Sequence, residues 1–381
     1  MKKRNTNLFA GNVFQEKLVN KMKIIHETIL EVDLNKLANN FNYLKSKLKS
    51  DTKIIAVVKA YAYGHGDITI ASYLEKLGAH ALWVADFEEG TRIRKSGVKI
   101  PIIIANPGTK STQQIIDNKL DVIIYNSELL HLYGKLDKAI RIHIKFDTGM
   151  NRYGFDASEV YKLVADLQKY PKLKIQSICS HLAASDNSTE DSFTNTQFQV
   201  FENVSNLFSK EFNQIIDRHI LNTNGVLRFP KKEYEMVRLG IGLYGVSDDN
   251  NLHQVSTLKS VISQVRTIKK GSKVGYDASF LAKQDMKIGV VPFGYADGLN
   301  RKLSTNNGVI IVQNIPCPII GKISMDSCMI NLKGTTAKTG DEVVIFGEEN
   351  AISSIANKLS TIPYEIFSSL NRRIKRVYSD I

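Results

Sequence analysis

Between residues 52 and 241, eight short apolar runs alternate with helical patterns, and this alternation constrains the fold more than any other feature of the sequence. Runs such as "KIIAVV" and "PIIIAN" are nearly continuous in β-branched residues, which is typical of parallel strands covered by helices on both faces. Eight such units predict a (β/α)8 barrel. A doubly wound open sheet is the alternative, but no G-x-G-x-x-G follows the first strand.

The pattern changes after the polar stretch "SDDNNLHQ", where strand-like runs such as "MKIGVVPFGY" and "GVIIVQNIPCPII", separated by turn signals, replace the alternation. We therefore expect a barrel domain over residues 25–250 and a second, mostly β domain over residues 251–381. Residues 1–24 begin with a basic cluster, but their apolar segment is short and no cleavage site follows it. We predict a flexible N-terminal extension there rather than an export signal.

Composition excludes several classes of protein. No apolar run approaches the roughly 18 residues that a membrane span needs. Cys179, Cys317 and Cys328 form no C-x-x-C pair, so we expect neither a disulfide framework nor a metal site, and a reducing cytoplasm fits best. The net charge of +13 comes from basic residues spread along the chain, so we expect no nucleic-acid partner.

A lysine stands at the end of the first barrel strand. The run "IIAVV" leads to Lys59, although a buried, unpaired ammonium is expensive. A surface lysine leaving the core would explain this position. Arg152, His181, Asn222 and Arg238 also follow strands, however, and the carboxyl ends of barrel strands carry the active site. We therefore predict a nucleophilic amine at the barrel mouth.

Two glycine-containing segments indicate a phosphate site. "NTNG" follows the seventh strand and "RLGIG" the eighth, where barrels commonly bind phosphate. Glycine lets backbone N–H groups approach an anion, and the Thr223 hydroxyl adds a donor. Ordinary glycine turns are the alternative. A phosphorylated aldehyde facing Lys59 would explain both features, which predicts pyridoxal phosphate held as a Schiff base.

These residues lie in sequence blocks that resemble the bacterial alanine racemases, pyridoxal phosphate enzymes of fold type III. The resemblance runs from about residue 26 to the C-terminus, and residues 1–24 are not part of it. The blocks are, in order, "AVVKAYAYGHG", "KFDTGMNRYGF", "SHLAASD", "VRLGIGLYG", "VGYDASF", "GYADG", "GKISMD" and "IPYEIFSSL". The family often has asparagine where this chain has Tyr61, and often cysteine where it has Ser324.

The resemblance implies interconversion of L- and D-alanine by two bases. Lys59 would carry the cofactor and serve one face of the substrate, and Tyr276 of a partner subunit would serve the other, so a homodimer with shared active sites is expected. Arg238 would face the pyridine nitrogen. Because arginine donates hydrogen bonds but practically never a proton, the ring would remain a weak electron sink.

The resemblance also assigns binding roles. Arg152 would contact the cofactor's phenolic oxygen and the substrate carboxylate, which Met325 of the partner would also contact. Lys145 aligns with a lysine that is often carbamylated, and Tyr295 and Asp326 with residues near the entrance of the site. The remaining cofactor contacts would be Tyr63, His181, Asn222, Thr223, Gly240, Ile241 and Tyr364.

Three alternatives stay open at this point. A diamino-acid decarboxylase shares the architecture, but Arg238 and "VGYDASF" argue against it. A cofactor-binding protein without racemase activity would lack the second domain and its Tyr276. A serine or broad-specificity racemase would open the pocket near Tyr364, which is present here. A supply of D-alanine for peptidoglycan is the pathway that the resemblance implies.

Overall fold

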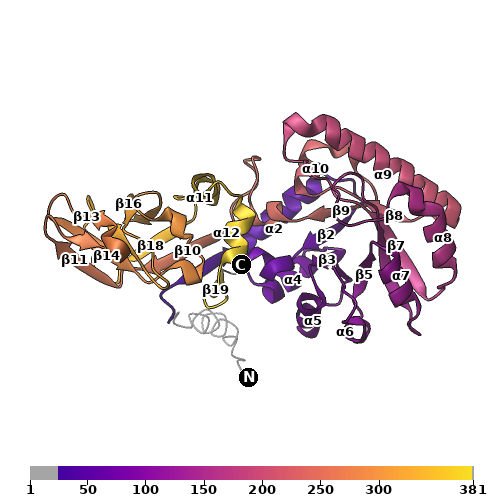
Figure 1. Ribbon diagram of the computed structural model, residues 1–381, viewed down its shortest axis with the longest axis horizontal. Helices are drawn as coiled ribbons and strands as arrows, with labels where there is room; N and C mark the ends of the chain where they lie inside the picture. Colours follow the sequence, from indigo (N-terminus) through magenta and orange to yellow (C-terminus); the bar gives the residue numbers. More distant parts are fainter. Residues whose placement is uncertain (1–24, 380–381) are drawn as a thin grey trace, which may run out of the picture.

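The computed structural model describes residues 25–379, so the expected extension at residues 1–24 lies outside the described residues. Figure 1 shows two domains side by side, with α12 and β19 where they meet. Within the described part of the chain, every helix is too short or too polar to serve as a membrane span.

The first domain is the expected barrel of eight parallel strands. The sheet order is β8-β7-β6-β5-β4-β3-β2-β9, and a backbone hydrogen bond from Arg238 N to Leu221 O (2.9 Å) draws the end strands together into a nearly closed barrel. The strands are β2 (Lys53–Val57), β3 (Ala81–Val84), β4 (Ile102–Ile104), β5 (Asp121–Ile124), β6 (Ile140–Lys145), β7 (Leu173–Cys179), β8 (Asp217–His219) and β9 (Met236–Leu239).

Helices cover the outside of this barrel, and their apolar faces form the main core with the outward faces of the strands. Asp33 caps the first of them, since its side chain accepts a hydrogen bond from Lys36 N at 3.0 Å. The helices are α2 (Leu34–Ser46), α4 (Asp67–Lys76), α5 (Phe87–Lys95), α6 (Thr112–Asp117), α7 (Ser127–Gly134), α8 (Val160–Gln168), α9 (Asp191–Phe212) and α10 (Thr223–Arg228). The short segment α3 (Lys59–Tyr63), which follows β2, has left-handed backbone angles over residues 60–63 instead.

The barrel interior differs from one side to the other. The inward side chains Ile55, Ala81, Ile103 and Ile123, from β2 to β5, form a small apolar cluster with Cys179 and Met236. Strands β6 to β9 also place buried polar side chains inside, namely His143, Ser177, His219 and Arg238. Half of the barrel centre is therefore a polar network rather than a hydrocarbon core.

The second domain is mostly β, as expected, and its main sheet has the order β11-β14-β17-β16-β15-β18-β10-β1-β19. Its helices are α11 (Ile352–Leu359) and α12 (Pro363–Ser369). Its strands are β10 (Ser256–Val261), β11 (Gln264–Ile268), β12 (Lys273–Val274), β13 (Phe280–Leu281), β14 (Met286–Val291), β15 (Val309–Val312), β16 (Ile315–Ile320), β17 (Cys328–Asn331), β18 (Glu342–Phe346) and β19 (Lys375–Ser379).

The structure corrects two details of this expectation. Strand β1 (Ile29–Asp33) lies inside the range expected for the barrel, but it pairs with β10 and β19 in the second sheet. The run at residues 308–320 is a hairpin rather than one strand, because Gln313 and Asn314 both adopt positive φ (52° and 62°), as a two-residue type I′ turn requires. The apolar pattern does not reveal these turn-forming backbone angles, so it did not show where the first strand of the hairpin ends and the second begins.

Candidate active site

The chain leaves β2 through an unusual left-handed turn that begins at Lys59. Four consecutive non-glycine residues, Ala60 to Tyr63, have φ between 52° and 58°. Such backbone costs about 1–2 kcal/mol per residue relative to the right-handed form, so other contacts must hold it. Glu89 supplies one, since its two carboxylate oxygens accept hydrogen bonds from Ala60 N (2.7 Å) and Ala85 N (2.8 Å).

Two glycines after the turn explain the rest of "KAYAYGHG". Gly64 and Gly66 have φ of 80° and 100°. A Cβ atom on Gly64 would lie 2.1 Å from Phe367 O, and one on Gly66 would lie 1.9 Å from the hydroxyl of Tyr378. Both contacts are with the second domain, so the glycines let the lysine-bearing loop pack tightly against it.

A cavity of about 300 Å³ opens at the carboxyl ends of the barrel strands. Every barrel-mouth residue predicted from the sequence lines it, and these residues are Lys59, Tyr63, Lys145, Arg152, His181, Asn222, Thr223, Arg238, Gly240, Ile241 and Tyr364. The prediction missed other lining residues, namely Val57, Trp83, Ala85, Ala105, Asn106, Tyr153, Cys179 and Ser180. Several of these also stand at strand ends, so the rule that a barrel's active site lies at the carboxyl ends of its strands could have found them.

The cavity is positively charged. Lys59, Lys145, Arg152 and Arg238 line it, and no carboxylate occurs among its lining residues in the described chain. Burial in the cavity lowers the pKa of Lys59, and the charges of Arg152 and Arg238 lower it further although Glu89 opposes them. Burial and the nearby cations also lower the pKa of Lys145. The cavity therefore favours anions and uncharged amines.

Arg238 is the buried cation at the base of the cavity. Its Nη2 atom donates to Ser180 O (2.6 Å) and Ile220 O (3.1 Å) and lies 3.1 Å from His181 Nδ1. Its guanidinium carbon lies 5.3 Å from the centroid of the Trp83 ring. Burial lowers the pKa of Arg238 to about 10, so it stays protonated at neutral pH. Burial and Arg238 push the pKa of His181 well below its usual value, so that ring is neutral.

Thr223 organises the opposite wall. Its hydroxyl accepts hydrogen bonds from Gly240 N (3.0 Å) and Gly242 N (3.4 Å). A Cβ on Gly240 would lie 2.8 Å from the hydroxyl of Tyr63, so only glycine leaves room there. The side-chain oxygen of Asn222 accepts from Gly225 N and Ser185 Oγ (both 2.9 Å), so Asn222 caps α10 and holds this wall in place.

The cavity leaves several polar groups open to a ligand. Among the described residues, the side chains of Lys59, Tyr63, Arg152 and Tyr364 have no hydrogen bond or ion pair. The rings of Tyr63 and Tyr364 lie 5.8 Å apart between centroids. One amine, two phenols and a guanidinium in a cationic cavity fit a phosphorylated aromatic aldehyde, since the amine bonds the aldehyde and the donors match its anionic groups.

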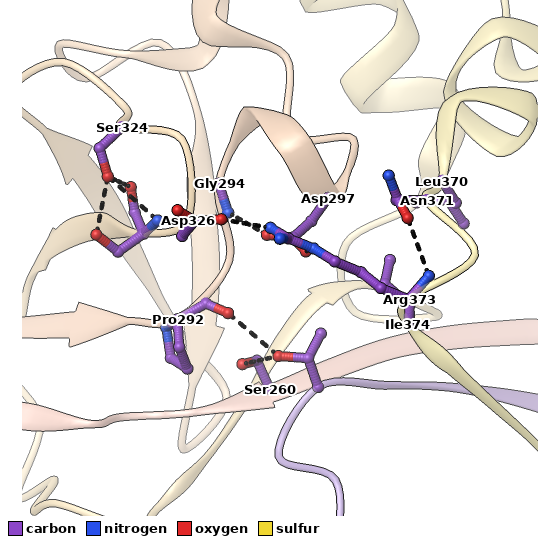
Figure 2. Close-up of polar contacts among 12 residues, drawn as sticks. Ser260, Pro292, Gly294, Asp297, Ser324, Asp326, Leu370, Asn371, Arg373 and Ile374 are labelled. Carbon is purple, nitrogen blue, oxygen red and sulfur yellow. Dashed lines mark hydrogen bonds and ion pairs between the residues drawn. The ribbon is translucent and has the colours of Figure 1, made fainter.

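Four predicted residues lie outside the cavity, on the surface of the second domain. Tyr276, Met325 and Tyr295 are 65%, 54% and 44% exposed. The fourth residue is Asp326, and Figure 2 shows that Arg373 donates to both Asp297 Oδ1 (2.6 Å) and Asp326 Oδ1 (2.7 Å). Within one chain, the structure therefore does not bring Tyr276 or Met325 to Lys59.

A second cavity, of about 310 Å³, lies within the second domain beside α11 and α12. Phe293, Phe346, Ile355 and Leu359 are among its mostly apolar lining residues. Its lining includes Arg301 and Lys358 but also the carboxylate of Glu365, unlike the lining of the barrel cavity, where the charged residues are all cations. In residues 25–379, no group of three His, Cys, Asp or Glu side chains could hold a metal ion.

Comparison with known proteins identifies the family to which the chain belongs. Residues 32–248 match the family model "Alanine racemase, N-terminal domain" and residues 255–378 match "Alanine racemase, C-terminal domain". The chain is 33% identical to alanine racemase 1 of Oceanobacillus iheyensis over 376 residues, covering 94% of this chain and 100% of that protein. It is 34% identical to alanine racemase 1 of Caldanaerobacter subterraneus subsp. tengcongensis over 372 residues, covering 93% and 95%.

Solved structures agree with this result. The alanine racemase of Clostridium difficile 630 superimposes with a TM-score of 0.89 at 30% identity, covering 94% of this chain and 97% of that one. The Bartonella henselae alanine racemase, described with covalently bound pyridoxal phosphate, gives a TM-score of 0.85 at 28% identity, covering 93% and 99%. The chain therefore belongs to the alanine racemase family, whose members are pyridoxal phosphate-dependent isomerases.

Proposed function

We propose that this chain interconverts L- and D-alanine with pyridoxal phosphate, as a homodimer whose two active sites each draw residues from both copies. The observation that carries the proposal is the barrel cavity, where a nucleophilic lysine faces a buried arginine among cations only. When bound, pyridoxal phosphate would link covalently to the amine and acidify the α-hydrogen of the substrate. The chain's own residues then determine which reaction follows.

Lys59 is the proposed base on one face of the substrate. Its lowered pKa increases the share of neutral amine, which is the form that can accept a proton. Arg152 lines the same cavity and would hold the substrate carboxylate, while Thr223, Tyr63, Tyr364 and the backbone near Gly240 would hold the cofactor's phosphate. Asn222 and Ile241 would support that cradle from the same wall.

Arg238 is proposed to donate a hydrogen bond to the ring nitrogen without giving up a proton. Its pKa, although lowered by burial, remains far above neutral pH. Keeping the ring nitrogen unprotonated weakens electron withdrawal, which favours returning the proton to the same carbon over other outcomes. His181, neutral and 3.1 Å from Arg238, would help to orient the guanidinium.

Tyr276 is proposed to act from a second copy of the chain. Racemisation needs an acid or base on the face of the substrate opposite Lys59. Among the described tyrosines of the same chain's second domain, Tyr364 alone lines the barrel cavity. An exposed phenol and the exposed Met325, 65% and 54% accessible, suit contact with another subunit's barrel mouth. Tyr295 and Asp326 would then border the entrance of that neighbouring site.

The direct experiment is to load the purified protein with pyridoxal phosphate and follow formation of D-alanine from L-alanine. We expect racemisation together with the absorbance band of a lysine-bound cofactor, and Lys59→Ala should lose both. A protein that binds the cofactor covalently but does not racemise alanine would instead be a cofactor-binding protein.

A serine or broad-specificity racemase is the second candidate function. Tyr364 lines the cavity and packs against Tyr63, which narrows the space for a substrate side chain. Because a small apolar pocket rejects an added hydroxyl only modestly, low turnover of serine is expected. Equal kcat/KM values for alanine and serine would favour the broader assignment.

Two further expectations belong to this proposal. Carbamylation of Lys145 would turn a cation into an anion beside Arg152, and the lowered pKa of Lys145 favours the neutral amine that reacts with carbon dioxide. The intact mass of the native protein tests this modification. A cytoplasmic location, with D-alanine supplied for peptidoglycan, is proposed because all three cysteines are free and buried.

A further inference from the structure

Four buried polar side chains connect Arg238 to the base of the barrel. Arg238 Nη1 contacts His219 Nδ1, and His219 Nε2 lies 2.9 Å from Ser177 Oγ. Ser177 Oγ lies 2.7 Å from His143 Nδ1, and His143 Nε2 lies 3.4 Å from Asp121 Oδ2. The result is an unbroken chain of contacts from the cavity to the opposite end of the barrel.

The two ends of this chain fix the direction of every hydrogen bond in it. An arginine can only donate, so His219 Nδ1 must accept and its proton must sit on Nε2. That proton points at Ser177 Oγ, so the serine hydroxyl is free to donate to His143 Nδ1. The proton of His143 is then on Nε2 and points at Asp121, whose carboxylate can only accept. All four bonds therefore run the same way, from Arg238 to Asp121.

Burial makes this direction hard to change. Asp121, His143, Ser177 and His219 are each at most 2% exposed, so water is not at hand to replace a lost partner. Burial and the charge of Arg238 push the pKa of His219 well below its usual value, which keeps that ring neutral. At the far end, Arg141 Nε (2.9 Å) and Nη2 (2.7 Å) both donate to Asp121 Oδ1 and hold the carboxylate in place.

We propose that Asp121, at the base of the barrel, is a remote positioning residue that sets the tautomers of His143 and His219 and thereby orients the guanidinium of Arg238. The role of Arg238 toward the ring nitrogen rests on the function proposed above, whereas the ordering of the histidines does not. In the part of the chain that the structure describes, the hydrogen bonds that join Asp121 to Arg238 run through side chains of β6, β7 and β8, so its influence is expected to pass through them.

The substitution Asp121→Asn should reverse the direction of the hydrogen bonds between Asp121 and Arg238. The two donors of Arg141 hold Oδ1, so an asparagine keeps its oxygen there and turns its NH2 group toward His143. His143 Nε2 must then accept, which moves its proton to Nδ1 and makes Ser177 Oγ its acceptor. The serine hydroxyl then loses His143 as an acceptor and has His219 Nε2 as its remaining buried partner. His219 is left with a proton on Nδ1, directly opposite an N–H of Arg238. Two donors facing each other would displace the guanidinium.

The test is ¹⁵N NMR of histidine-labelled protein without cofactor, which reports the tautomer of each ring independently of activity. In the unmodified chain we expect both His143 and His219 protonated on Nε2, and in Asp121→Asn we expect the His219 proton on Nδ1. In a Ser177→Ala background the link is cut, so adding Asp121→Asn should leave His219 unchanged. A His219 proton on Nδ1 in the unmodified chain, or an unchanged His219 in Asp121→Asn, would overturn the proposal.

Asp67→Asn is the matched control. Asp67 is equally buried and accepts from Arg92 Nε (2.8 Å) and Nη2, but it has no hydrogen bond to His143 or His219. It should leave both tautomers unchanged, which separates a directional effect from loss of a buried ion pair. In the loaded enzyme, Asp121→Asn should lower kcat/KM by about tenfold. If the tautomers behave as expected but the unmodified enzyme does not racemise alanine, the proposed function fails and this inference stands.

Discussion

The barrel mouth and the exposed surface around Tyr276 are both expected to serve one reaction, yet the chain builds them very differently. In the barrel, strand ends and buried hydrogen bonds bring Lys59, Thr223 and Arg238 into one cavity. On the second domain, Tyr276 and Met325 point into solvent, 65% and 54% exposed. A single chain thus brings the cationic groups of the cavity together and leaves Tyr276, the proposed second acid–base group, outside it.

The loop that carries Tyr276 is nevertheless well ordered by local contacts. Asp277 pairs with Lys322, and the backbone N–H of Lys322 donates to Ser279 Oγ at 3.0 Å. Contacts within one chain therefore hold the residues next to Tyr276. The Tyr276 side chain is thus exposed while its neighbours are held in place, as a group offered to another subunit requires.

The largest expected effect comes from removing the proposed proton-transfer group of each region by mutation. Lys59→Ala and Tyr276→Phe should each lower racemisation by roughly 10²–10⁴-fold, because each removes one proton-transfer group. If the sites are shared, mixing the two inactive variants after dissociation should restore about a quarter of the wild-type activity, since half of the dimers are mixed and each has one intact site. Racemisation kinetics and sedimentation of the mixture check this.

Tyr276→Phe alone should retain the cofactor, which is the control for that experiment. No recovery on mixing, despite formation of mixed dimers, would place Tyr276 and Lys59 in the same subunit's site and contradict the shared active site.

Acid should weaken the contact between the barrel domain and the second domain. His65 is fully buried between them, with Nε2 2.9 Å from Ser256 Oγ and its ring stacked on Tyr244, and burial lowers its pKa to about 4. The unfolded chain takes up this proton below pH 6.5 and the folded chain does not, so stability is lost as pH falls from 6.5 toward 4. The loss amounts to about 3 kcal/mol for this group. Urea unfolding at several pH values measures it.

His65→Gln is the variant to compare, because glutamine keeps a donor and an acceptor but does not titrate. Its unfolding free energy should vary less steeply over the same pH window. An equal slope in both proteins would assign the acid sensitivity to the other buried histidines.

The charge of the cavity should control how fast the cofactor attaches. The neutral amine of Lys59 reacts with an aldehyde, and Arg152 contributes to its lowered pKa, so attachment should already be fast below the usual pKa of lysine. Arg152→Met should raise that pKa and slow attachment a few-fold near pH 8, whereas Arg152→Lys should slow it less because the charge is kept. Stopped-flow absorbance after mixing protein with pyridoxal phosphate measures both rates.

The smallest expected effect concerns the surface near Met325. Asp326→Asn removes one of the two carboxylates that hold Arg373 and should raise KM for alanine no more than a few-fold, as an exposed ion pair contributes little. Asp297→Asn, whose carboxylate is buried and also accepts from Gly294 N (2.9 Å), should have the larger effect. Steady-state kinetics of the two variants rank them, and the reverse order would show that Asp326 contacts the substrate path itself.

The sequence reveals the barrel because apolar strands and helical patterns are local signals, and each strand-end residue follows from the strand that precedes it. Lys59 and Arg238 are found this way. The chain Arg238–His219–Ser177–His143–Asp121 is not, since its members lie far apart in sequence and look like ordinary strand residues. The place of β1 in the second sheet is hidden for the same reason, because β1 carries the alternation of any strand and no mark of its neighbours.

The sequence by itself determined the eight barrel units, the mostly β second domain, the polar strand ends and the family, because periodicity and motifs are written residue by residue. Only the tertiary structure decided that Tyr276 stands outside its own cavity, that Gly64 and Gly66 pack against Phe367 and Tyr378, and that Asp121 is linked to Arg238. These facts depend on which distant segments meet, and hydrogen-bond direction and steric contact act only once they do.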